Sequence, residues 1–225
     1  MKNVLAAFAF AAFLLPAAVL ADSTVLPNGT YTYDVAVNGK SIGTSTITID
    51  RPDAATIRLK EKNSFGALSA EATSIIDATT YQAKTFDASY NTPQGAQSAH
   101  ATFSPGKIDI SVPGQPDFHA KADAKAPLME LSDNFTLVGA ISGAAQWNHD
   151  KAASYTQVSL QGGKIEVVPV AAATITRPDG VPAGDLGVSE TDSDGTGTLW
   201  YNPQTFIPDF VSSGPATVTL TGQTH

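Results

Sequence analysis

Four histidines are the side chains of this sequence best suited to acid–base chemistry or metal binding: His100, His119, His149 and His225. None of them stands in an H-x-H, H-x₃-H or H-E-x-x-H spacing, so no metal motif is visible. His100 falls inside an expected strand, Ser98 to Phe103, and His119 falls in or beside a later one. One interpretation pairs the two across neighbouring strands; the other leaves them as ordinary surface histidines.

Nucleophilic catalysis has no local signature in this chain. Ser212-Ser213-Gly214 lacks the leading glycine of G-x-S-x-G, and no strand–serine–helix elbow surrounds any serine. A hydrolase would therefore need a dispersed site, in which a histidine, a carboxylate and a serine or water converge in one cleft. Such a cleft is most readily imagined around His100 or His119.

The segment Thr191 to Gly197 resembles part of a calcium loop, because Asp192 and Asp194 stand just before Gly195. Counting from Asp192, however, Pro203 occupies the twelfth position, where an EF-hand requires a bidentate glutamate. A solvated turn built from aspartate and glycine is the alternative. We therefore expect no metal and no cofactor.

The elements that would position these residues are predominantly strands. Thr30 to Val37 and Ser41 to Asp50 are rich in β-formers, and Asn38-Gly39 between them is typical of a type I′ hairpin turn. Ten or more short strands at near-regular spacing favour a sandwich or a strongly curved antiparallel sheet, without parallel βαβ winding. The other expected strands are Ala55–Asn63, Leu68–Ile76, Thr80–Tyr90, Ser98–Phe103, Ile108–Val112, Tyr155–Leu160, Ile165–Val170, Thr198–Tyr201, Thr205–Val211 and Ala216–Leu220.

One segment has helical rather than strand spacing. Apolar residues recur at intervals of three and four from Leu128 to Ile141, and Ser132 offers an N-cap. The pattern predicts a helix over roughly Asp133 to Gln146, which Gly139 and Gly143 weaken by about 1 kcal/mol each. A lone amphipathic helix must bury its apolar stripe on the sheet, so we expect it to lie as a lid over the concave face.

Composition limits the classes of function. The chain has 225 residues, no cysteine, and 13 Lys+Arg against 21 Asp+Glu, for a net charge of −8. The absence of cysteine excludes disulfides, thiolate metal sites and a cysteine nucleophile. The acidic balance argues against nucleic acid or an anionic membrane as partner.

The N-terminal segment has the features of a secretory signal peptide. Lys2 is followed by the apolar run Val4 to Leu15, then Pro16, and small residues end at Ala21. We expect cleavage there; a transmembrane anchor is the alternative. The expected mature chain, 22–225, is a single acidic β-rich domain, soluble and located in the periplasm or outside the cell.

Three short motifs carry a resemblance to a known group. Tyr31 to Thr44 resembles the opening hairpin of uncharacterised periplasmic proteins with "Gly-Lys-x-Ile-Gly", Leu131 to Phe135 is similar to their Asp-Asn element, and Gly197 to Pro208 resembles their last hairpin. These proteins look like relatives of the half-open β-barrel group that includes lipoprotein carriers. The resemblance implies a curved antiparallel sheet around an apolar cavity, with helical segments as a plug.

These observations together predict a mainly β protein: one highly curved antiparallel sheet, or half-open barrel, with one helix over its concave face. We expect a non-enzymatic protein that binds a lipid or other hydrophobic ligand. A cell-envelope module that binds another protein, and a hydrolase with a dispersed site, are the alternatives. The expected ligand-binding residues are Phe135, Leu137, Val138, Ile141, Trp147 and Trp200.

Overall fold

The computed structural model describes most of the chain after the predicted signal peptide. The predicted signal peptide, residues 1–21, lies outside the described residues, as does Phe135. The described residues are 25–92, 95–121, 129–132, 136–150, 154–159, 165–192 and 195–225.

Eight strands form an antiparallel meander, which we call the N-terminal arm. Each strand pairs with the next along the chain. Apolar and polar residues alternate along these strands, so one face is buried and the other is in solvent. The strands are β1 (Gly29–Val37), β2 (Lys40–Asp53), β3 (Thr56–Phe65), β4 (Leu68–Asp77), β5 (Ala83–Thr92), β6 (Gly95–Ser104), β7 (Lys107–Ser111) and β8 (Phe118–Ala120).

The first hairpin turn has the geometry that its dipeptide predicts. Asn38 and Gly39 have φ angles of 51° and 74°, both in the left-handed region that a type I′ turn requires. Val37 pairs with Lys40 directly across the turn. The predicted turn is therefore confirmed, and with it the register of the first two strands.

The remaining strands and the helix form the C-terminal arm. It contains one parallel pair, β9 with β10, and is otherwise antiparallel. Its elements are β9 (Met129–Ser132), α1 (Thr136–Asp150), β10 (Ser154–Ser159), β11 (Ile165–Ala172), β12 (Leu186–Asp192), β13 (Gly195–Tyr201), β14 (Pro208–Ser213) and β15 (Ala216–Thr224).

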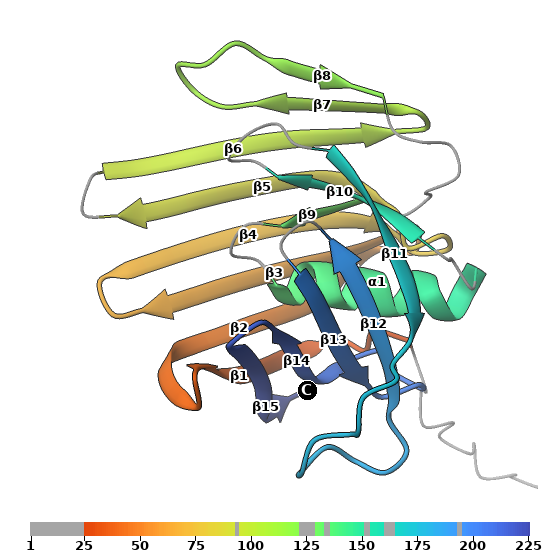
Figure 1. Ribbon diagram of the computed structural model, residues 1–225. Coiled ribbons are helices and arrows are strands. Elements are labelled where there is room, and N and C mark those ends of the chain that lie inside the picture. The colour runs from red at the N-terminus through yellow and green to blue at the C-terminus, as the bar shows by residue number, and fades with distance from the viewer. Residues whose placement is uncertain are drawn as a thin grey trace, which may run out of the picture.

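The two arms join through β1 and β15 and make one curled, unclosed sheet. The strand order is β8-β7-β6-β5-β4-β3-β2-β1-β15-β14-β13-β12-β11-β10-β9, with β8 and β9 at its two ends. Figure 1 shows the C-terminal arm folded back in front of the N-terminal arm, with α1 between them. The predicted curved antiparallel sheet with one helix over its concave face is confirmed.

The helix fills the concavity. It packs against β3 on one side and against β13 and β14 on the other. The buried apolar side chains of α1 belong to the same core cluster as those of both arms. Burial of this apolar surface is what holds the two arms around the helix, since a sheet with one apolar face must cover it.

Two sequence expectations need correction. The unit β9–α1–β10 is a parallel crossover, whereas the sequence predicts a sheet without parallel βαβ winding. The sequence pattern counts the four residues of β9 in the helical spacing from Leu128 to Ile141. A short apolar strand and a helical turn cannot be distinguished at that length. The predicted helix is confirmed, but it continues to Asp150 instead of ending at Gln146.

Candidate functional site

A buried glutamate that contacts the first turn of α1 is the main polar feature of the inner face. Glu61 extends from β3 into the core and is 1% exposed. Its Oε2 accepts a hydrogen bond of 2.9 Å from the backbone N–H of Val138, and its Oε1 accepts from Ser45 Oγ at 3.2 Å and from Asn63 Nδ2 at 3.1 Å. The carboxylate thus satisfies a free N–H of the first helical turn and faces the positive end of the helix dipole.

Burial dominates the electrostatics of this group. Removal from water raises the pKa of Glu61 from 4.5 to about 7, while the hydrogen bonds from the backbone of Val138 and Leu137 and from Asn63 and Ser45 oppose the rise. Near neutral pH, Glu61 is therefore divided between its charged and neutral forms. The strength of its hydrogen bonds to the first turn of α1 therefore changes over the same pH range.

The other end of α1 is also attached to the N-terminal arm. The amide Nε2 of Gln146 donates to the carbonyl oxygen of Thr80 in the β4–β5 connection. Trp147 follows and is partly buried against the core. With polar contacts at both ends and an apolar middle, α1 is an internal plug of the sheet in this structure.

Most of the predicted ligand-binding residues meet in this plug. Leu137 and Ile141 are fully buried, Val138 is 4% exposed, and all three belong to the core cluster, with Trp147 packed at its margin. Phe135 lies outside the described residues. These side chains are brought together, and in this conformation they contact the protein's own core.

Trp200 is separated from the others. It alternates with Leu199 and Tyr201, which are core residues, and therefore lies on the other face of β13. Its ring lies against Gly187, where a Cβ would come within 2.8 Å of Trp200 and of Ala173. It covers a glycine on the outer face and does not line the interior.

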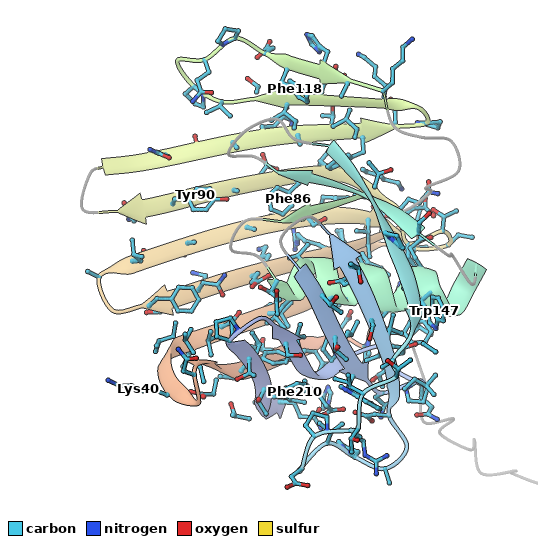
Figure 2. All side chains as sticks on the ribbon, viewed as in Figure 1. Lys40, Phe86, Tyr90, Phe118, Trp147 and Phe210 are labelled. Carbon is cyan, nitrogen blue, oxygen red and sulfur yellow. The ribbon has the colours of Figure 1, made fainter. Side chains whose placement is uncertain are left out.

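An apolar rim lies where the inner face reaches the ends of β3, β4 and β5. We use this name for Phe65, Leu68 and Tyr90: Leu68 is 46% exposed, and the other two are partly buried against the core. Phe65 pairs with Leu68, and Tyr90 pairs with Ala70. Figure 2 shows Tyr90 beyond the region that the C-terminal arm overlies in that view, whereas Phe86, on the same strand, lies behind it.

Small side chains continue the inner face behind the rim. Ala70, Ala72, Ala88 and Ala99 are all buried. They lie on neighbouring positions of β4, β5 and β6 and form a shallow apolar floor, because their side chains are small. The rim and this floor make a continuous apolar surface from solvent to the core.

The outer face of the same strands carries a groove of about 360 Å³, lined by polar side chains and by small apolar residues. Asp87 and His100 lie opposite each other on β5 and β6, with 2.6 Å between Asp87 Oδ1 and His100 Nδ1. Ser111 is the partner of His100 on its other side, on β7. Other short hydroxyl side chains and Glu71 line the same groove.

The groove brings together the three residue types that the hydrolase alternative requires. His100 lies between Asp87 and Ser111 in one cross-strand row. Both side chains of the hydrogen-bonded pair are, however, about half exposed, at 49% for His100 and 60% for Asp87. Catalytic electrostatics depend on a water-excluded setting, so this open row is better suited to hydrogen-bonding a ligand than to covalent catalysis.

His119 does not share a site with His100. It pairs with Asp109 across β7 and β8, with 2.6 Å between Nδ1 and Oδ1, and Lys107 contacts the same carboxylate at 2.7 Å. The two histidines lie two strands apart, each with its own aspartate. Of the two interpretations, the one that pairs them across neighbouring strands is wrong, because the strand β7 lies between them.

No group of three or more His, Asp or Glu side chains suited to a metal occurs within the described ranges. Gly195, beside the calcium-like segment, has a φ of 145°, which fits a glycine turn between β12 and β13. Asp194 lies outside the described residues. Among those that are described, Glu61 is the functional candidate that sequence reasoning missed, although its place at an inner position after Ile57 and Leu59 was a visible signal.

Comparison with known proteins identifies the fold and no activity. No family model matches the chain, and no curated protein matches it in sequence. The crystal structure of a β-barrel-like protein of a domain of unknown function, DUF1849, from Brucella abortus is similar with a TM-score of 0.53 and 11% identity, over 89% of this chain and 98% of that one. A DUF1089 family protein from Pseudomonas aeruginosa has a TM-score of 0.39 and 10% identity, over 92% of this chain and 95% of that one.

The chain thus has the fold of bacterial β-barrel-like proteins of unknown function. At this identity the likeness concerns the fold alone. Of the expected resemblance, the β-barrel-like part is supported, whereas the lipoprotein-carrier part is not, because the similar structure is of a domain of unknown function.

Proposed function

We propose that this protein binds an apolar ligand, such as a lipid chain, against the inner face of its curled sheet. The observation that carries the proposal is the apolar rim. Phe65, Leu68 and Tyr90 leave apolar surface in solvent that is continuous with the core. Exposed apolar surface that continues into a concave interior is typical of ligand entry.

The shape behind the rim supports the same function. The sheet is unclosed, so within the described part of the chain β1 with β15 is the only strand pairing between its two arms. The alanine floor on β4 to β6 has only small side chains, and we propose that a flexible acyl chain lies against it. Leu137, Val138 and Ile141 would contact the ligand if α1 shifts outward, while Trp200 would not, because it lies on the outer face.

The proposal includes a location in the periplasm or outside the cell. It rests on the predicted signal peptide, residues 1–21, and on the acidic, cysteine-free composition. α1 has 15 residues, and no helix within the described part of the chain is long and apolar enough to cross a membrane. We propose lipid or another hydrophobic small molecule as the partner, and no catalytic role for the inner face.

The first experiment is native mass spectrometry of the protein purified from its own cell envelope, followed by lipid extraction. A defined bound mass identifies the ligand. Uptake of the fluorescent apolar probe N-phenyl-1-naphthylamine then measures the site in solution. Leu68→Ser combined with Tyr90→Ser should reduce probe uptake at least severalfold, because both changes remove apolar surface from the rim.

The matched control is Ile175→Ser. Ile175 is 49% exposed, as apolar as Leu68, and lies in the β11–β12 connection away from the rim. Equal loss of probe uptake in this variant, or an apo mass with no uptake from a lipid panel, would overturn the proposal. The cell-envelope protein-interaction module would then be the better account.

A further inference from the structure

The outer groove is a two-row array of hydrogen-bonding side chains. In the first row Thr73, Asp87, His100 and Ser111 are successive cross-strand partners on β4, β5, β6 and β7. Neighbours in such a row lie about 5 Å apart. In the second row, two residues along each strand, Glu71, Ser89 and Ser98 are partners in the same way.

The side chains of the groove determine what can occupy it. All of these seven line the groove, and the remaining wall and floor come from small residues and Pro113. Hydroxyls both donate and accept, and the carboxylates accept. An apolar ligand would leave this array without partners, which costs free energy for every polar group that loses its water.

The charges of the groove discriminate among polar ligands. Asp87 and Glu71 supply two carboxylates. Glu71 is paired with Lys62 at 2.7 Å, and Asp87 with His100 at 2.6 Å. With both carboxylates on the wall, an anionic ligand meets repulsion, whereas a neutral or amino-bearing ligand does not.

We propose that the outer groove of β4 to β7 is a second binding site, which takes a neutral or amino-bearing oligosaccharide. The rows cross the strands, so an extended sugar chain would lie across them with roughly one ring per strand. The vicinal hydroxyls of a sugar both donate and accept, which is what the serine, threonine and aspartate side chains require. The His100 ring holds Asp87 in place through its Nδ1 and leaves Nε2 for the ligand.

This site is independent of the apolar ligand site. Ala72, Ala88 and Ala99 of the floor also line the groove, but the substitutions below are at outer-face positions, which alternate with the inner-face positions of rim and floor. Asp87→Asn retains the size of the side chain and removes its charge. Ser98→Leu fills the middle of the second row with an apolar group.

The test is an amide NMR titration of the full mature chain with triacetylchitotriose, chitosan trimer and maltotriose, and with trigalacturonate as the anionic comparison. We expect shifts centred on residues 71–73, 87–89 and 98–100 with at least one neutral or amino sugar at millimolar concentration. Asp87→Asn and Ser98→Leu should each weaken binding about tenfold or more.

Asp109→Asn is the matched control, because Asp109 makes the same contact with His119 but does not line the groove. It should leave sugar binding unchanged. Three results would overturn the proposal: no shifts with any neutral or amino sugar, equal binding of trigalacturonate, or the same loss of affinity in Asp109→Asn. Unchanged dispersion of the spectra establishes that each variant is folded.

Discussion

The two faces of strands β4 to β7 share one backbone and one register yet differ in every other respect. Inward, Phe86, Ile108 and Ile110 join the core. Outward, Asp87 contacts His100 and Asp109 contacts His119, and both pairs are open to solvent. The comparison shows that stability is carried by the inner face and that the outer face is free to vary, because screened surface pairs contribute little.

Glu61 is where the inner face departs from this division. It is a carboxylate with four hydrogen-bond donors around it and almost no exposure. The outer face has its counterpart in Glu71, which is 59% exposed and pairs with Lys62. The two glutamates lie on adjacent strands. Substitutions of each therefore measure how much a carboxylate contributes to the free energy of unfolding on each face of the sheet.

The largest effect should come from Glu61→Ala. The change leaves the backbone N–H groups of Leu137 and Val138 and the hydroxyl of Ser45 buried without their acceptor. We expect a loss of about 3–5 kcal/mol in the free energy of unfolding, measured by urea denaturation. Glu71→Ala should cost less than about 1 kcal/mol; equal costs for the two variants would contradict the comparison.

The pH dependence of stability should be the next largest effect. The pKa of Glu61 rises from 4.5 to about 7 on folding, so the folded chain holds a proton that the unfolded chain has lost. This contribution is fully present below about pH 4.5, falls as the pH rises through 7, and amounts to about 3 kcal/mol. Asp185, 7% exposed, has its pKa raised by burial and by Asp209, which acts in the same direction.

Urea midpoints between pH 5 and pH 8 measure this slope. Glu61→Gln should flatten it, and Asp185→Asn should flatten it by a separate increment, since Glu61 lies on β3 and Asp185 in the connection before β12. Asp77 provides the opposite sign: hydrogen bonds from Thr80 and Thr79 and the Lys84 ammonium lower its pKa, so its contribution is lost only in strong acid. A slope that survives in both variants would show that other groups control it.

An intermediate effect is expected at the first turn, which belongs to neither face. Gly39 has a φ of 74° and no atom within 4 Å of a Cβ placed on it. Gly39→Ala therefore introduces backbone strain without a clash, and should lower the free energy of unfolding by about 1 kcal/mol. Asn38→Ala, at the adjacent position, should act in the same direction, because asparagine tolerates the left-handed region better than alanine does.

The smallest effect should be seen at His100. His100→Ala removes one exposed contact with Asp87 and should lower the free energy of unfolding by about 0.5 kcal/mol or less, as should His119→Ala. Differential scanning calorimetry of both variants provides the measurement. A loss of several kcal/mol in either would mean that the outer face carries stability after all.

Local pattern was enough to predict the N-terminal arm. Alternation in Ile57 and Leu59, and the Asn38-Gly39 turn, depend only on neighbouring residues. The C-terminal arm was harder, because β9 has four residues and β12 follows a long Pro/Gly-rich connection. Neither length nor spacing separates such strands from turns.

The candidate sites depend on contacts between distant segments. Glu61 meets Val138 from 77 positions away, and no periodicity joins the two. To predict the pair of Asp87 with His100, the register of β5 and β6 must be known. A shift of that register by one residue would place the two side chains on opposite faces of the sheet. The sequence alone could place Leu137, Val138 and Ile141 on one apolar face, but it could not reveal that Trp200 faces outward.

The pairing of β1 with β15 has a consequence for the folding kinetics. This ladder joins Thr30 to Thr224 and is the only direct strand pairing, within the described part of the chain, between the two arms. Each arm can assemble from sequence-local hairpins, but the ring of core around α1 is complete only when the last strand has been made and docked. Every other ladder joins strands that are consecutive in the sequence, so the long-range β1–β15 pairing should be the last to form.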